Sequence, residues 1–262
     1  MEIVLEEVSY NSSNNEELLN NITYTFNNSI TFVNGLSAKL LYELLFQKKK
    51  TKNGFVALDK KGVYKDVIYI SNHNEYNKGN LYDEIVYLNK YYKLNYKRLD
   101  KRIKDSLKMV NLDFTYIYKS FSEMSDSELK LVYLAIAMFL NSKIIILDYF
   151  EKGLSFNEIN YIKKLVVKLN KMYNKNIIIF SNDLDAYLNI VKNIVIFKNG
   201  NIVFEGTNKD LYNKDLYKYI DKPNIVSFIN YLNDNNHDFD HYIDIKELLK
   251  AIYRDVENKW DI

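Results

Sequence analysis

Runs of consecutive apolar residues alternate along the chain with segments whose apolar residues recur every three or four positions. Runs of four residues with almost no polar interruption lie at 30–33, 144–147, 177–180 and 194–197. A strand that is buried on both faces has this pattern, and such strands form parallel sheets covered by helices. The helical spacing occurs at 40–47, 98–110, 129–140 and 156–172. The pattern therefore predicts an α/β fold with a parallel sheet.

The remaining segments predict additional strands and a helical tail. Residues 1–34 contain two or three short strands, including 3–5 and 22–26, and two more strands are expected at 55–58 and 67–70. The apolar runs around Asn199-Gly200 predict a β-hairpin, because Asn-Gly favours a tight turn. Residues 216–256 form a polar tail with helical character.

The stretch from Ser120 to Ser155 contains the main motif around which the other segments of the chain are interpreted. A polar turn at 122–126 opens the helix that continues to Leu140, and the apolar run 144–147 is closed by Asp148. Functional groups of parallel sheets gather at the carboxyl ends of the strands. Asp148 is therefore a candidate functional residue, although a polar cap at the end of a strand explains it equally well.

A second candidate site lies where the strand 30–33 leads through a polar turn into a helix. A phosphate-binding P-loop has this order and the pattern Gly-x-x-x-x-Gly-Lys-Ser/Thr. With Lys39 at the lysine, Val33 and Ala38 replace the glycines that let the backbone cradle phosphate, and Leu40 replaces the hydroxyl that binds Mg²⁺. Lys39, with Ser37 before it, is either a phosphate contact or a solvated residue at a helix start.

The order of these motifs resembles the ATP-binding subunit of ABC transporters. In that family, a Leu-Ser-Gly-Gly-Gln signature turn opens a helix, and a Walker B strand ends in Asp-Glu before a Ser-Gly-Leu-Asp loop. The corresponding segments here are Met124-Ser125-Asp126-Ser127-Glu128, Asp148-Tyr149 and Lys152-Gly153-Leu154-Ser155. The resemblance covers almost the entire chain, and it is strong in the order of elements and weak at the catalytic positions.

The resemblance implies a P-loop NTPase-like ABC ATPase core with an N-terminal antiparallel β subdomain, a helical subdomain and a C-terminal helical extension. We expect the ATPase-like domain at 1–215, with the helical subdomain at about 76–140, and the extension at 216–262. The implied cofactors are ATP and Mg²⁺, with weak or absent binding. The candidate cofactor-binding residues are Lys39, Ser37, Asp148 and Ser125, and Asp148 is the candidate metal ligand.

Several positions depart from the family pattern. Tyr149 stands where a carboxylate orients water, and its side chain, with a pKa of ~10, is neutral at pH 7. Asn182 replaces a histidine that contacts the γ-phosphate and the attacking water, and Asn72 falls nearest to a glutamine that senses Mg²⁺ and the membrane partner. No catalytic residue is therefore assigned, and the chain is expected to be inactive by itself.

The signature turn is also altered. Asp126 replaces its first glycine, and a carboxylate ~4 Å from a phosphate oxygen is repelled by roughly 1–4 kcal/mol. Ser125 keeps the motif serine. However, Ser125 and Glu128 have the spacing of a capping box, which is a purely structural use of both residues.

The composition limits the classes of partner and metal site that can be expected. The 262 residues carry a net charge of +2, which gives no electrostatic argument for a nucleic-acid partner. No apolar run approaches the ~20 residues that span a bilayer. The chain has no cysteine, which excludes disulfides and thiolate metal sites, and its three histidines are scattered.

The tail resembles the C-terminal extension of the ATPase subunits of energy-coupling factor (ECF) transporters. We therefore expect a degenerate ATP-binding subunit of an ECF-type importer at the cytoplasmic face of the membrane. It would pair with a second ABC ATPase subunit and dock a transmembrane coupling subunit through the groove beside residues 72–86. Two alternatives remain open: a structural or regulatory module that binds a soluble partner, and an active ATPase that uses Glu151.

Overall fold

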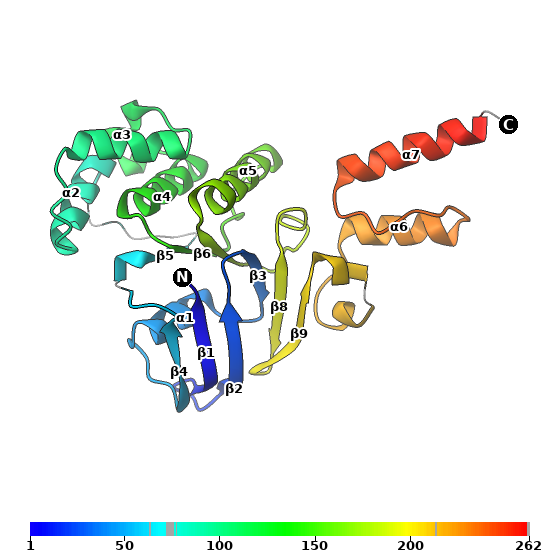
Figure 1. Cartoon of the computed structure of the whole chain (residues 1–262), viewed down its shortest axis with the longest axis horizontal. Helices are drawn as coiled ribbons and strands as arrows, with labels where there is room; N and C mark the ends of the chain where they lie inside the picture. Colours follow the sequence, from blue (N-terminus) through cyan, green and yellow to red (C-terminus); the bar gives the residue numbers. More distant parts are fainter. Residues whose placement is uncertain (63, 72–75, 77, 213, 261–262) are drawn as a thin grey trace.

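The computed structural model describes residues 1–62, 64–71, 76, 78–212 and 214–260 (Figure 1). Asn72, the candidate for the glutamine position, and the neighbouring residues 73–75 lie outside the described part of the chain. Of the segment 72–86 beside which a groove is expected, the structure describes residues 76 and 78–86, the last of which begin helix α2, Leu81–Tyr91.

The apolar runs form a six-stranded sheet with the strand order β5-β6-β7-β3-β8-β9. Five of these strands are parallel, and the last is antiparallel. The strands are β3 (Ile30–Asn34), β5 (Val67–Ser71), β6 (Ile144–Asp148), β7 (Asn176–Phe180), β8 (Asn193–Lys198) and β9 (Asn201–Thr207). The prediction of a parallel sheet is confirmed.

The large sheet is covered on both faces because alternate residues of its central strands enter different cores. Ile144 and Ile146 pack with helix α1 (Ala38–Leu45) and the small sheet, whereas Ile145 and Leu147 pack with the helices on the other face. All four side chains have no solvent-exposed surface. An apolar run without alternation is what a strand between two cores requires.

The small sheet is antiparallel, with the order β2-β1-β4, and is built from β1 (Ile3–Asn11), β2 (Glu17–Phe26) and β4 (Asn53–Leu58). The strands expected at 55–58 and 67–70 therefore lie in different sheets. The hairpin expected near 194–204 is confirmed as β8 and β9. Asn199 and Gly200 both have positive φ, of 49° and 76°, as a type I′ turn requires.

Helices cover the second face of the large sheet. These are α4 (Asp126–Leu140) and α5 (Phe156–Tyr173), and α4 also contacts α2 and α3 (Leu99–Met109). In Figure 1, α2 and α3 lie at the end of the molecule near β5. The start of α4 lies beside the loop between β6 and α5, because a Cβ atom at Gly153 would lie 2.6 Å from Asp126 Oδ2.

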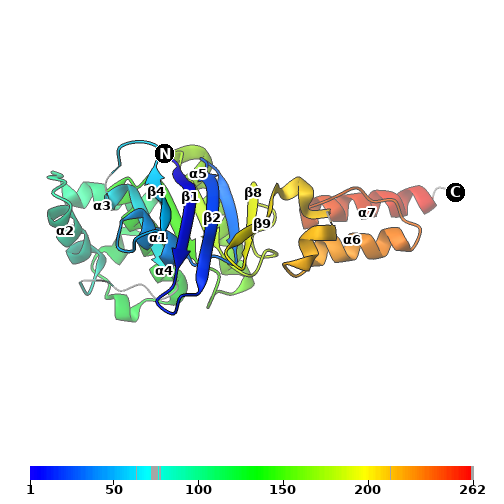
Figure 2. The ribbon, with the colours of Figure 1, turned by 90° about the horizontal axis from the view of Figure 1, so that it is seen from below.

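The C-terminal segment lies beyond β9, at the opposite end of the molecule from α2 and α3 (Figures 1 and 2). It contains α6 (Asn224–Asp234) and α7 (Ile245–Trp260). Its buried apolar residues include Leu216, Ile225, Val226, Ile229, Phe239 and Leu248. The division of the chain at residue 215 and the subdomain at 76–140 stay predictions. Among the helices of the described residues, none is long and apolar enough to cross a membrane.

Candidate functional site

Four neighbouring parallel strands of the large sheet end at one edge, which we call the carboxyl edge. It is formed by Ser71, Asp148, Asn34 and the residues that follow β7, Ser181 and Asn182. The register places Ser71 opposite Asp148, and Asp148 opposite Phe180. The fold thus brings together the candidate residues Asp148, Tyr149 and Asn182, which are far apart in the sequence.

Asp148 is hydrogen-bonded at this edge by a tyrosine of the neighbouring strand. The Tyr69 hydroxyl donates to Asp148 Oδ2 over 2.6 Å. The Tyr69 ring stacks on Tyr42 of α1, with 5.6 Å between the ring centroids. Burial, and then the hydrogen bond to Asp148, raise the pKa of Tyr69, so its phenol stays a donor at physiological pH. One oxygen of the candidate metal ligand is therefore engaged by the chain's own phenol.

Tyr149 joins a second hydrogen-bonded group that spans three strands. Its hydroxyl donates to Asn182 Oδ1 over 3.0 Å, and Asn34 Nδ2 donates to the same oxygen over 3.0 Å. Asn34 also donates to the Ser181 carbonyl. Burial, and then the nearby Asp148 and Glu151 carboxylates, raise the pKa of Tyr149. Tyr149 therefore acts as a neutral donor and provides no base.

The backbone of Tyr149 is held in the left-handed region, with φ of 48°, a conformation that costs a non-glycine residue roughly 1–2 kcal/mol. Its N–H donates to the Phe180 carbonyl over 2.9 Å, and the Lys152 ammonium lies 4.0 Å from the centroid of its ring. These contacts fix the direction of the side chain across the ends of the strands.

Glu151, the candidate base of the alternative active ATPase, is bonded through both carboxylate oxygens. Ser181 Oγ donates to Oε1 over 2.6 Å, and the buried Tyr187 hydroxyl donates to Oε2 over 3.0 Å. Ser181 and Tyr187 are almost fully buried. This geometry supports a structural role for Glu151, which ties the loop after β6 to the segment after β7.

The turn between β3 and α1 is short and tightly packed. Gly35 has φ of 77°, and a Cβ atom at this position would lie 1.9 Å from the Phe197 carbonyl oxygen. Ser37 is the N-cap of α1, and its hydroxyl accepts from the Leu40 N–H over 3.2 Å. Leu40 is 4% exposed and packs in the core beneath the turn. The candidate Ser37 thus has a local structural partner.

Lys39 lies in the first turn of α1, with its side chain exposed. Among the described residues, no hydrogen bond or ion pair engages its ammonium. Its position at the helix start agrees with either of the two interpretations of the sequence. The role of Lys39 in cofactor binding stays a prediction.

The signature-like turn before α4 forms the capping box that the spacing of Ser125 and Glu128 indicates. Ser125 Oγ accepts from the Glu128 N–H, and Glu128 Oε2 accepts from the Ser125 N–H over 2.9 Å. Glu128 also accepts from the Tyr116 hydroxyl and from Lys119 Nζ. The hydrogen bond from Tyr116, followed by those from Lys119 and Ser125, lowers the pKa of Glu128 to about 2. The helix N-terminus is therefore occupied by the chain's own carboxylate.

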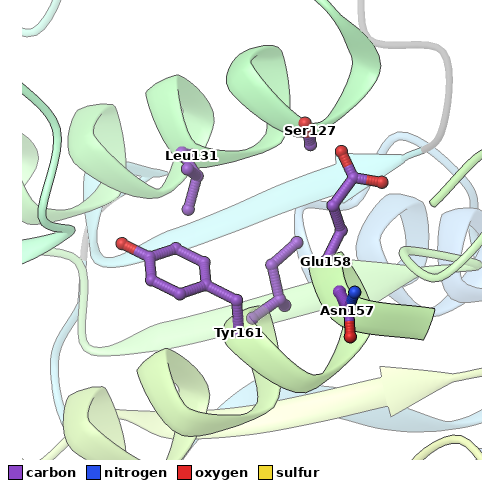
Figure 3. Close-up of a pocket in the computed structure, with 6 residues that line it drawn as sticks. Ser127, Leu131, Asn157, Glu158 and Tyr161 are labelled. Atoms are coloured by element: carbon purple, nitrogen blue, oxygen red, sulfur yellow. The ribbon is translucent and has the colours of Figure 1, made fainter. Parts of the chain in front are cut away.

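A hollow of about 230 Å³ lies between the N-terminal halves of α4 and α5. Figure 3 shows Ser127 and Leu131 of α4 facing Asn157, Glu158 and Tyr161 of α5. Hydrogen bonds from Ser127 and Ser155 lower the pKa of Glu158 to about 2. The hollow therefore lies between the N-terminal turns of two capped helices.

The arrangement of the acidic and histidine side chains bears on whether Asp148 could hold a metal ion. Within the described ranges, no group of three or more His, Asp or Glu side chains could hold a metal ion. The assignment of Asp148 as a Mg²⁺ ligand stays a prediction. The contacts of Tyr69 and Asn34 had no signal in the sequence, because they depend on which strands are neighbours.

Comparisons with known proteins identify similar chains. No protein-family model matches. An ABC transporter ATP-binding protein of Clostridium perfringens strain 13 is 23% identical over 224 residues, which cover 79% of this chain and 78% of the relative. The energy-coupling factor transporter ATP-binding protein EcfA2 of Clostridium perfringens strain SM101 has the same identity and coverage, 23% over 224 residues, with 79% of this chain and 78% of the relative.

Among solved structures, cbiO1 from Clostridium perfringens, described as part of the ABC transporter complex cbiONQ, superposes with a TM-score of 0.70. It is 20% identical, and the match covers 87% of this chain and 98% of that chain. The resemblance seen in the sequence is therefore confirmed: the relatives are ABC transporter ATP-binding proteins, and the fold is that of an ABC ATPase.

Proposed function

We propose that this chain is an ATPase-type subunit of an ECF-type importer that no longer hydrolyses ATP. It pairs with a second ABC ATPase subunit and docks a transmembrane coupling subunit at the cytoplasmic face of the membrane. The observation that carries this proposal is a structural match over 87% of this chain, together with relatives that include an ECF transporter ATP-binding protein. Binding of ATP and Mg²⁺ by this chain is weak or absent.

The groups that end the strands support the proposed loss of hydrolysis. Tyr149 replaces the carboxylate that would orient water, and its phenol donates to Asn182. Asn182 in turn carries no group that titrates near neutral pH. Glu151 is engaged by Ser181 and Tyr187. The part of the function that survives is therefore assembly, which depends on surfaces and not on these side chains.

Co-purification tests this proposal. The chain would be tagged in its native cell, membranes extracted in mild detergent, and the recovered proteins identified. Recovery of a second ABC ATPase and a multi-span membrane protein is the expected result. Recovery of the chain alone, or with soluble proteins only, would contradict the transporter role and support the regulatory alternative.

Two matched variants sharpen this experiment. Val86 of α2 is 39% exposed and belongs to the segment 72–86 proposed for docking, and Met172 is 71% exposed near the end of α5. Val86→Glu should reduce recovery of the membrane protein at least about tenfold, because a buried carboxylate without a partner is costly. Met172→Glu should leave recovery unchanged. Equal recovery with both variants would place the docking surface elsewhere.

The purified chain should show no ATP turnover above the background of a mock preparation. Turnover that disappears in Glu151→Gln would contradict the loss of hydrolysis and support the active ATPase that uses Glu151. This assay is independent of the co-purification, because it needs no partner.

A further inference from the structure

The carboxyl edge does not have the features that hold a Mg-nucleotide. A phosphate cradle needs a loop whose backbone N–H groups are free to point at the anion. Here Gly35 is packed against the Phe197 carbonyl, and the Leu40 N–H is satisfied by Ser37 Oγ. Val33 is fully buried in β3. The turn therefore has the geometry of a compact strand-to-helix connection.

The position for a metal is also unsuited to one. The residue after Lys39 is the buried Leu40, which has no oxygen to offer. Asp148 accepts from the Tyr69 phenol over 2.6 Å, where a metal-bound water would otherwise donate. The Tyr69 ring is itself held by stacking on Tyr42. Displacing the phenol would therefore disturb a packed contact between β5 and α1.

The ends of the strands are further joined by polar groups. Asn182 Oδ1 accepts from both Tyr149 and Asn34, which connects the ends of β6, β7 and β3. The backbone continues this connection, because the Ser181 N–H donates to the Val33 carbonyl and the Tyr149 N–H donates to the Phe180 carbonyl. The side chains of Tyr149, Asn182 and Asn34 are thus paired with one another within the chain.

We infer that the carboxyl edge is closed by the chain's own phenols and amides, so that the folded protein neither holds Mg-ATP nor depends on it for stability. Tyr69 donates to one carboxylate oxygen of Asp148, the candidate metal ligand. Tyr149, Asn182 and Asn34 bridge the strand ends where a bound nucleotide would otherwise link them. This inference concerns the isolated subunit and does not rest on the proposed partners.

Thermal unfolding with and without ligand is the first test. The melting temperature of the full chain would be measured with MgCl₂ alone, with ATP plus EDTA, and with Mg-ATP, each at millimolar concentration. A ligand that binds only the folded state raises the melting temperature once it exceeds its Kd. The expected change is within about 1 °C in all three conditions. A rise of about 3 °C or more in any of them overturns the inference.

The Tyr69–Asp148 pair is tested with a double-mutant cycle. Tyr69→Phe keeps the stacked ring and removes the donor, and Asp148→Ala removes the acceptor. A hydrogen bond to a charged acceptor is stronger than a neutral one, so Tyr69→Phe should lower the melting temperature by about 3–6 °C. In the Asp148→Ala background, the same substitution should lower it by less than half as much. Equal losses in both backgrounds would overturn the pairing.

Two further variants complete the test. Tyr149→Phe removes one neutral hydrogen bond and should lower the melting temperature by about 2 °C. Tyr118→Phe is the matched control, because Tyr118 is 69% exposed and lies outside the edge, and it should change the value by less than about 1 °C. A loss with Tyr118→Phe as large as that with Tyr149→Phe would contradict the closure. Co-purification with a membrane protein is a separate result, so either proposal can fail without the other.

Discussion

Replacing Gly35 by alanine tests whether the turn between β3 and α1 is a fixed structural connection. Gly35 has φ of 77°, and a Cβ atom would lie 1.9 Å from the Phe197 carbonyl oxygen and 2.9 Å from its carbonyl carbon. Both atoms belong to the backbone of β8, which is held in the sheet by β3 and β9. The clash therefore cannot be relieved by rotating a side chain.

The expected loss is the sum of two contributions. A left-handed conformation costs an alanine about 1–2 kcal/mol. Forcing an extra methyl group into a packed site costs about 1–3 kcal/mol, because the turn or β8 must shift. Gly35→Ala should therefore lower the free energy of unfolding by about 2–5 kcal/mol.

Urea unfolding followed by far-ultraviolet circular dichroism measures this loss. Gly79 provides a matched control, because a Cβ atom there would have no heavy atom within 4 Å and its φ lies outside the left-handed range. Gly79→Ala should change the free energy of unfolding by less than about 0.5 kcal/mol. A loss below about 1 kcal/mol for Gly35→Ala would refute the packed turn and leave room for a loop that rearranges around phosphate.

Four other substitutions, with one control, test the caps and the core. The stabilisation that ionised Glu128 provides should be complete above its ordinary pKa of 4.5 and should be lost as the pH falls toward about 2. The urea midpoints of Glu128→Gln and the parent chain should therefore converge in acid, and a difference that stays constant with pH would contradict this. Ser125→Ala and Ser155→Ala should each cost about 1 kcal/mol in urea unfolding, and no loss in either would refute its capping role. Leu147→Ala should lower the free energy of unfolding by about 2–5 kcal/mol, whereas Leu249→Ala, at a 47% exposed position, should lower it by less than about 0.5 kcal/mol. Similar losses for the two variants would contradict the assigned burial.

The candidate site was only partly predictable. The capping box at Ser125 and Glu128 could be predicted because its two residues are three positions apart, and the structure contains it. The assignments of Lys39, Ser37, Asp148 and Ser125 to cofactor binding stay predictions, since they come from a resemblance. The hydrogen bond from the Tyr69 phenol to Asp148 could not be predicted from the sequence around either of these two residues.

The sequence by itself determined the local elements. The run Ile144–Leu147 specifies a strand between two cores because it offers no polar face, and Asn199-Gly200 specifies a tight hairpin because both residues tolerate positive φ. Strand order was decided only by the tertiary structure. Pairing of β5 with β6 brings Tyr69 to Asp148 across 79 positions, and pairing of β3 with β7 brings Asn34 to Asn182 across 148. Such contacts depend on which strands become neighbours, and that choice minimises the free energy of the whole core, so no local pattern encodes it.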